Sequence, residues 1–206
     1  MPGINSDPEC IPESVSTARS PHTTADERGV PGRIILSADE IAEIVARLGR
    51  EISVDYSDRH PVLVNLLKGG VVFLADLIRQ ITIAHHIEFM KVSSYGGGTE
   101  SSGSVQIIND LERSIEGRDV ILVEDVVDTG TTLAYISDVL ALRTPRSIEV
   151  CTLFRKNVIR HKNAAIRYVG SDIPNVFVVG YGLDFNENYR HLPYIAELDF
   201  PDAQLK

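Results

Sequence analysis

Short apolar runs and amphipathic stretches alternate along this chain. Residues 120–123 are all apolar and mostly β-branched, which predicts a strand covered on both faces rather than a buried helix. After a polar interval, Leu133, Ile136 and Leu140 recur at the spacing of one helix face. The same arguments predict further strands over residues 62–67, 87–94, 147–153 and 176–179.

Two more helices are predicted from local signals. Ser37 and Glu40 have the spacing of a capping box at the start of an apolar helix face. A second helix follows the glycine turn at residues 68–70, directly after the strand over residues 62–67. Strands that alternate with helices in this way predict an α/β fold with a mostly parallel central sheet flanked by helices.

The N-terminal part differs from this pattern. Residues 1–32 are rich in Pro, Ser, Thr and Gly and show little periodicity, which predicts a disordered or loosely attached tail. Residues 33–206 then form one domain. The chain has 206 residues, of which 43% are hydrophobic, and this is enough material for one sizeable core.

Charge and cysteine content narrow the function classes. The net charge of -9 argues against a general nucleic-acid binder, which needs a basic face. No apolar run reaches the length of a membrane span. Two cysteines, Cys10 and Cys151, imply no disulfide framework. We therefore expect a cytoplasmic protein that binds neither nucleic acid nor membrane.

The strongest candidate chemistry follows the strand at residues 120–123. Residues 129–132 (Thr-Gly-Thr-Thr) offer hydroxyls and free N–H groups at a helix N-terminus, which suits phosphate. A loop for phosphate alone would avoid carboxylates, yet Glu124, Asp125 and Asp128 stand beside it. The combination indicates a ligand with a phosphate at one end and hydroxyls or Mg²⁺ at the other. A sugar phosphate has these properties.

The segment from Glu124 to Thr132 resembles the phosphoribosyl-pyrophosphate (PRPP) binding motif of type I phosphoribosyltransferases. Residues 66–70 (LLKGG), 93–96 (SSYG) and 177–184 (FVVGYGLD) resemble the hypoxanthine-guanine branch of that family. The resemblance runs from about Arg33 to Leu198, with the four motifs in the family's order. It implies the type I phosphoribosyltransferase fold, with a small hood built from the chain ends beside the central sheet.

The resemblance also implies the reaction. The phosphoribosyl group would pass from PRPP to hypoxanthine or guanine, which are 6-oxopurine bases. A nucleoside monophosphate and pyrophosphate would form, with Mg²⁺ as the cofactor. Family members are oligomeric, so we expect a homo-oligomer, either a dimer or a tetramer.

The PRPP site follows from the matched motifs. Glu124 and Asp125 would hold the ribose hydroxyls, partly through Mg²⁺, and the loop after Asp128 would hold the 5-phosphate. Lys68 would begin the pyrophosphate loop, with a cis peptide bond at Leu67-Lys68. The residues expected to bind PRPP are Glu124, Asp125, Asp128, Thr129, Gly130, Thr131, Thr132, Lys68, Gly69, Ser94, Tyr95 and Arg190. The last motif pair, Ser94 and Tyr95, would belong to a lid continued by residues 96–104.

The base site follows in the same way. Asp128 would take or hold the proton on purine N7, and Lys156 would donate to the exocyclic oxygen O6. Phe177 would stack on the ring, and the backbone of Val178 would read the base edge. Asp184 would bind beside the base and complete a Mg²⁺ ligand set with Glu124 and Asp125.

Two other functions are alternatives to a hypoxanthine-guanine phosphoribosyltransferase. A PRPP-sensing regulator can keep this fold and motif without the activity, although it needs a DNA- or RNA-binding face or an added helix-turn-helix. This chain is acidic, and its N-terminal tail is unlike a helix-turn-helix. Another phosphoribosyltransferase of the same fold would act on a different base, such as xanthine, adenine, orotate or uracil. Lys156, Phe177 and Asp184 favour a 6-oxopurine, but the sequence does not rank hypoxanthine, guanine and xanthine.

Overall fold

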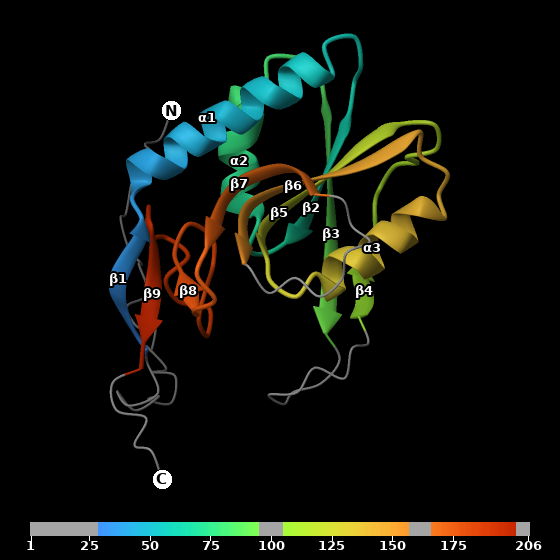
Figure 1. The fold of residues 1–206 in the computed structure, drawn as a ribbon. Helices are drawn as coiled ribbons and strands as arrows, with labels where there is room; N and C mark the ends of the chain where they lie inside the picture. Colours follow the sequence, from blue (N-terminus) through green and yellow to red (C-terminus); the bar gives the residue numbers. More distant parts are fainter. Residues whose placement is uncertain (1–28, 95–104, 157–165, 201–206) are drawn as a thin grey trace, which may run out of the picture.

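The computed structural model describes residues 29–94, 105–156 and 166–200 (Figure 1). A six-stranded sheet forms its centre, with the strand order β4-β3-β2-β5-β6-β7. Every neighbouring pair is parallel except β3 with β4. The strands are β2 (Val62–Leu67), β3 (His86–Ser94), β4 (Val105–Asn109), β5 (Asp119–Val127), β6 (Ser147–Lys156) and β7 (Ile166–Ile173).

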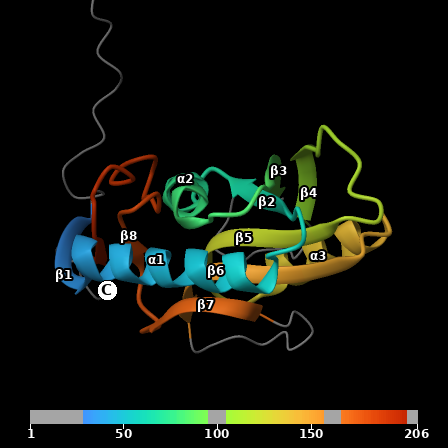
Figure 2. The ribbon, with the colours of Figure 1, turned by 90° about the horizontal axis from the view of Figure 1, so that it is seen from above.

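Three helices cover the central sheet, α1 (Ala38–Asp55), α2 (Val71–Gln80) and α3 (Thr131–Ala141). Residues on one side of the strands, such as Leu63, pack with α1 and α2 in one buried cluster. Residues on the other side, such as Val64, pack with α3 in a second cluster. The predicted α/β class with a mostly parallel, helix-flanked sheet is therefore confirmed. Figure 2 shows α1 running from β1 along the central strands.

The predicted capping box is present at the start of α1. The Ser37 hydroxyl accepts a hydrogen bond from the Glu40 N–H at 3.3 Å, and the Glu40 carboxylate accepts one from the Ser37 N–H at 2.8 Å. Each side chain thus satisfies a backbone donor that the first turn leaves free.

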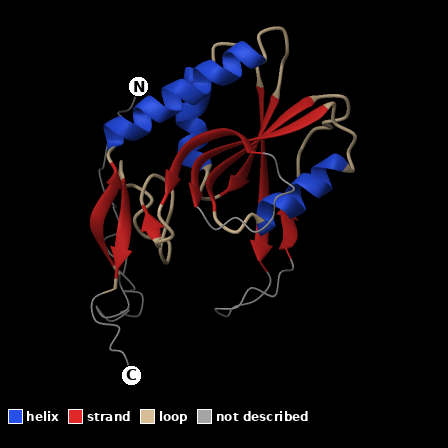
Figure 3. Ribbon diagram, viewed as in Figure 1, coloured by secondary structure: helices blue, strands red, loops and turns tan. Residues whose placement is uncertain are grey.

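A separate three-stranded sheet has the order β1-β9-β8, and Figure 3 shows it beside the central sheet. Its strands are β1 (Val30–Leu36), β8 (Val178–Val179) and β9 (Ile195–Asp199). This sheet is the expected hood, because β1 and β9 come from the two ends of the described chain. Residues 30–32, which we assigned to the tail, lie in β1 because Val30 and Pro31 pair with β9. Residues 1–28 lie outside the described residues.

The prediction for residues 176–179 was wrong in two respects. The strand there is shorter, and it pairs with β9 in the hood rather than with the central sheet. Gly180, with φ +104°, turns the chain directly after it. The outer place in the central sheet belongs to β7, which the sequence did not predict because its apolar positions form no continuous run.

Among the described residues, no helix combines the length and apolar character needed to cross a membrane. Cys151 is buried on β6, and Cys10, the other cysteine of the chain, lies outside the described residues.

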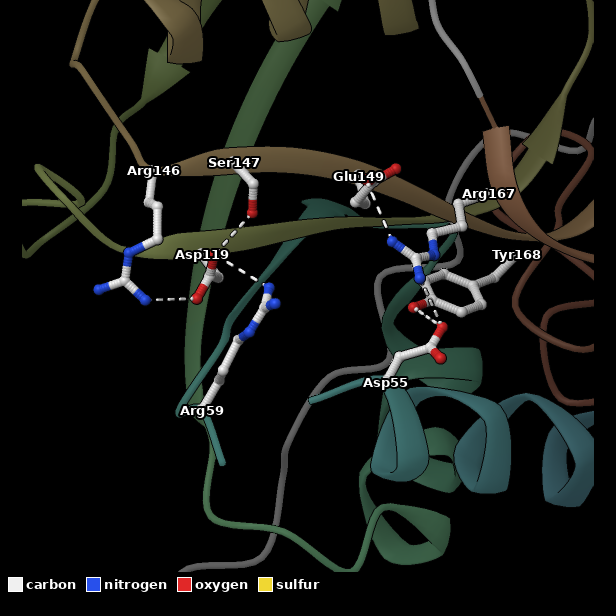
Figure 4. A network of polar contacts seen from close by, with 8 residues as sticks. All are labelled: Asp55, Arg59, Asp119, Arg146, Ser147, Glu149, Arg167 and Tyr168. Atoms are coloured by element: carbon white, nitrogen blue, oxygen red, sulfur yellow. Dashed lines mark hydrogen bonds and ion pairs between the residues drawn. The ribbon is translucent and has the colours of Figure 1, made fainter. Parts of the chain in front are cut away.

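A network of charged side chains ties the amino ends of the central strands together (Figure 4). The buried Asp119 carboxylate, at the start of β5, accepts from the Ser147 hydroxyl at 2.7 Å and pairs with Arg146 at 2.9 Å and Arg59 at 3.7 Å. A buried carboxylate needs such partners to offset its lost hydration. The network therefore joins β5 to the start of β6 and to the segment before β2.

We predict that Asp119→Asn lowers the free energy of unfolding by about 1–3 kcal/mol, because it removes the charge that both arginines share. The side chains of Arg59 and Arg146 are 49% and 64% exposed, so the loss stays below that of a fully buried pair. Urea unfolding at neutral pH measures the change. Asp58→Asn, at an exposed carboxylate outside this network, is the matched control. Equal effects of the two substitutions would contradict the assignment.

Candidate active site

Parallel pairing places the carboxyl ends of β2, β5 and β6 at one edge of the central sheet. Asn65 of β2 lies opposite Val123 of β5, and Glu124 lies opposite Thr152 of β6. The loops that follow these strands therefore meet. In open α/β sheets this edge is where ligands bind.

The loop after β5 leads into α3 through Gly130, whose φ of +81° favours glycine. The Thr129 and Thr131 hydroxyls lie 3.1 Å apart, and the Thr129 hydroxyl also accepts from the Thr131 N–H at 3.4 Å. A cavity of about 120 Å³ opens here, at the N-terminus of α3. Its lining includes the predicted residues Glu124, Asp128, Thr129, Gly130, Thr131 and Thr132.

A second cavity of about 380 Å³ adjoins the first, because Val126 and Asp128 line both. It brings together segments that are far apart in the sequence. Its lining includes the predicted residues Lys68, Gly69, Asp125, Asp128, Lys156, Phe177, Val178, Asp184 and Arg190. Ser94 ends β3 but its side chain is not described, and Tyr95 and residues 96–104 lie outside the described residues.

Lys156 and Asp128 form an ion pair at the wall of the second cavity, with Nζ 3.0 Å from Oδ2. The Lys156 side chain is 11% exposed and that of Asp128 is 51% exposed. The pair joins the end of β6 to the loop after β5. It presents a donor and an acceptor side by side at the cavity wall.

The turn after β2 packs tightly against two other segments. The Leu67-Lys68 peptide bond is cis, as we predicted. A Cβ on Gly69 would collide with the Asp125 carboxylate, and a Cβ on Gly182 would collide with the Gly69 carbonyl. These two glycines therefore allow the turn to touch both Asp125 and the segment after β8.

Glu124 and Asp125 are held in surroundings that disfavour their charged forms. Burial raises the pKa of Glu124 well above its usual value, and the neighbouring Asp125 adds to this rise. Burial also raises the pKa of Asp125 to about 6, although the N–H donated by Val126 and the charge of Arg190 oppose the rise. One oxygen of Glu124, Oε1, is buried and has no hydrogen-bond partner among the described residues. A hydrogen-bond donor or a cation beside them would therefore stabilise the ionised forms of both carboxylates.

Asp184 and Arg190 lie on the segment after β8 and contact each other. Arg190 Nη2 lies 2.7 Å from Asp184 Oδ1, and Arg190 Nη1 donates to the Gly182 carbonyl at 2.7 Å. The other Asp184 oxygen accepts from the Glu187 N–H at 2.8 Å. Within the described part of the chain, no group of three or more His, Cys, Asp or Glu side chains could hold a metal by itself. Glu124, Asp125 and Asp184 therefore do not form a closed cage.

Three residues near the site were missed by the sequence analysis. Phe185 and Phe200 contact Phe177 edge-on, with ring centroids 5.7 Å and 6.4 Å from its ring. Glu187 contacts Lys68 and Arg190. Phe185 follows Asp184 directly, which was a local signal, whereas nothing in the sequence placed Phe200 or Glu187 at this cavity.

The fold and this site define a class of nucleotide-forming transferases, and comparison with known proteins agrees. The family model of the phosphoribosyl transferase domain matches residues 33–186. The chain therefore belongs to the phosphoribosyltransferase family.

Named relatives place the chain in one branch of the family. It is 50% identical over 193 residues to a hypoxanthine-guanine phosphoribosyltransferase of Mycobacterium tuberculosis, which covers 89% of this chain and 95% of the relative. A crystal structure of a hypoxanthine phosphoribosyltransferase from Staphylococcus aureus has a TM-score of 0.78 at 46% identity, covering 82% of this chain and 92% of that one. A hypoxanthine-guanine phosphoribosyltransferase from Bacillus anthracis, with a HEPES molecule in its active site, has the same TM-score at 38% identity, covering 82% and 99%.

We predict that Asp125→Asn stabilises the unliganded protein above pH 6. The folded-state pKa of Asp125 lies above its unfolded value, so the parent protein loses stability as the pH rises from about 4 to about 6. The neutral variant avoids this loss and should gain about 1–3 kcal/mol at pH 8 and almost nothing at pH 4. Urea unfolding at both pH values measures the difference. A gain that is the same at both would show that the Asp125 charge is not its source.

Proposed function

We propose that this enzyme transfers the phosphoribosyl group of PRPP to hypoxanthine or guanine, forming a nucleoside monophosphate and pyrophosphate in purine salvage. The observation that carries the proposal is the Lys156–Asp128 pair in a cavity that also contains Phe177 and the cations Lys68 and Arg190. Such a cavity accommodates a base at one end and an anionic leaving group at the other.

The donor and acceptor pattern of the Lys156–Asp128 pair determines which base the site favours. Guanine presents O6, an acceptor, next to N7 on one edge, whereas adenine presents an amino donor in place of O6. Lys156 supplies a donor to O6, and Asp128 accepts the proton carried by N7 while N9 attacks the ribose. An adenine amino group would instead face the Lys156 ammonium, donor against donor. This arrangement favours 6-oxopurines.

The aromatic cluster provides the surface for the ring. Phe177 is 47% exposed, so a large part of its side chain is available to a ligand. Phe185 and Phe200 contact it edge-on and hold its orientation. The backbone of the buried Val178, which adjoins Phe177, reads the base edge.

The PRPP site extends from the base pocket to α3. The 5-phosphate occupies the cavity at residues 129–132, where free N–H groups and the helix dipole favour an anion. Glu124 and Asp125 accept the ribose hydroxyls. Lys68, Gly69 and Arg190 hold the pyrophosphate. Ser94, at the end of β3, and Tyr95, which lies outside the described residues, belong to the same proposed PRPP site.

The site suits Mg²⁺ bound together with substrate. Mg²⁺ is usually held by one or two carboxylates plus substrate phosphates rather than by an all-protein cage. The unpartnered buried oxygen of Glu124 and the raised pKa of Asp125 both fit a cation nearby, and Asp184 lines the same cavity as Asp125. When bound, Mg²⁺ supplies positive charge that stabilises the departing pyrophosphate.

The residues of the chain then act in one reaction. The bond between the ribose C1 and the pyrophosphate oxygen breaks as N9 forms its bond to C1, and positive charge builds on the ribose ring. Lys68 and Arg190 offset the charge of the leaving group. Lys156 draws electron density toward O6, and Asp128 holds the N7 proton.

We also propose that the protein works as a cytoplasmic homo-oligomer, a dimer or a tetramer. Light scattering after size-exclusion chromatography measures the mass and separates these two states. A PRPP-sensing regulator is less well supported, because a sensor has no need for a donor and acceptor pair matched to a base edge. Xanthine stays open as a substrate because it also carries O6.

A spectrophotometric assay tests the function, with PRPP and Mg²⁺ present and hypoxanthine, guanine, xanthine and adenine offered separately. We expect magnesium-dependent turnover of hypoxanthine or guanine and none of adenine. PRPP binding without turnover of any base would instead support the regulator. Turnover of adenine would contradict the base assignment.

Substitutions in the ion pair test the two roles. We predict that Asp128→Asn lowers kcat about 10²–10⁴-fold, the range for a lost general base. Lys156→Ala should lower kcat/KM for guanine about 10²–10³-fold, as for a lost donor to developing charge.

Arg155→Ala is the matched control for this pair. Arg155 neighbours Lys156 on β6 but pairs with Asp172, so its removal should leave turnover nearly unchanged. Undiminished guanine turnover in Lys156→Ala would rule out the O6 contact, and undiminished turnover in Asp128→Asn would rule out the base.

A further inference from the structure

We propose that Glu187 is an internal counter-anion of the pyrophosphate site, which pyrophosphate displaces when it binds to Lys68 and Arg190. This inference rests on the proposed function, which assigns the pyrophosphate group to these two cations. It adds a residue that controls affinity for PRPP and pyrophosphate without being part of their binding site.

The Glu187 carboxylate bridges the two cations. Its Oε1 lies 2.9 Å from Lys68 Nζ, and its Oε2 lies 3.3 Å from Arg190 Nη2. Lys68 lies in the turn after β2 and Arg190 in the segment after β8, 122 positions apart in the sequence. The Glu187 carboxylate therefore contacts both cations, each with one of its two oxygens. An anionic ligand such as pyrophosphate would contact the same two cations with several oxygens.

The backbone holds Glu187 in this position. Its N–H donates to Asp184 Oδ2 at 2.8 Å, and its φ is +63°. It lies in the turn between Phe185 and Asn188, whose backbones hydrogen-bond in both directions. The carboxylate is thus directed to the two cations by a local turn rather than by a flexible extended segment.

The contact is nevertheless weak enough to be displaced. The side chains of Glu187 and Lys68 are 65% and 55% exposed, so water screens their attraction. The hydrogen bonds from Lys68 and then from Arg190 lower the pKa of Glu187, so its carboxylate is ionised at neutral pH. Pyrophosphate carries more negative charge than one carboxylate and offers more acceptor oxygens, which favours the exchange.

Lys68 and Arg190 lose different contacts when pyrophosphate replaces the Glu187 carboxylate. Arg190 keeps its contacts to Asp184 and to the Gly182 carbonyl. Lys68 has no other ion pair among the described residues, so releasing Glu187 frees it entirely. The released carboxylate stays close to the bound anion through the same turn, and it competes again for both cations as pyrophosphate leaves.

Glu187→Gln tests this competition because it keeps the shape of the side chain and removes its charge. We expect Mg²⁺-pyrophosphate to bind about two- to fivefold more tightly to the full-length variant by isothermal titration calorimetry, the range that an exposed ion pair represents. Pyrophosphate should become a stronger product inhibitor by a similar factor, and the KM for PRPP should fall. Glu187→Asp, with a shorter carboxylate, should lie between the variant and the parent.

Glu43→Gln on α1 is the control, because Glu43 is exposed and lies away from the cavity. If Glu187 served only to position Lys68 and Arg190, its neutral variant would bind pyrophosphate less tightly. Weaker or unchanged binding would therefore overturn the inference. Turnover of hypoxanthine or guanine by the parent protein is measured in parallel. An active parent with unchanged pyrophosphate affinity in Glu187→Gln defeats this inference alone, whereas an inactive parent defeats the proposed function.

Discussion

The hydrogen-bond ladder between the parallel strands β2, β5 and β6 determines where the three central loops of the site lie. Parallel strands end at the same edge, so the turn at Lys68, the loop at Asp128 and the end of β6 at Lys156 come together without any contact between their side chains being required. The buried cores on both faces hold this ladder rigid. The network around Asp119 anchors its opposite end.

This edge concentrates groups whose charges the fold disfavours. Burial raises the pKa values of Glu124 and Asp125, so the protein places carboxylates where their ionised forms lower its stability. A ligand that supplies hydroxyl donors or a cation removes this penalty. Stability without substrate and affinity for substrate are therefore opposed at these two residues.

The hood completes the site with segments that have little regular structure of their own. Four non-glycine residues between β8 and β9 have positive φ, namely Tyr181, Asn186, Glu187 and Tyr189. This irregular path lets Asp184, Glu187 and Arg190 reach across to the turn after β2. The aromatic cluster of Phe177, Phe185 and Phe200 then closes the base end.

Local sequence determined four strands of the central sheet (β2, β3, β5 and β6), the three helices with the capping box at Ser37, and the identity of the polar loops after the strands, because periodicity and turn chemistry act over a few residues. The resemblance to a family supplied the cis bond before Lys68. Tertiary structure alone decided that β8 belongs to the hood and that β7 completes the central sheet, since a short apolar run does not specify its pairing partner. It also brought Glu187 to Lys68, a contact between residues 119 positions apart that depends on how the hood packs against the sheet.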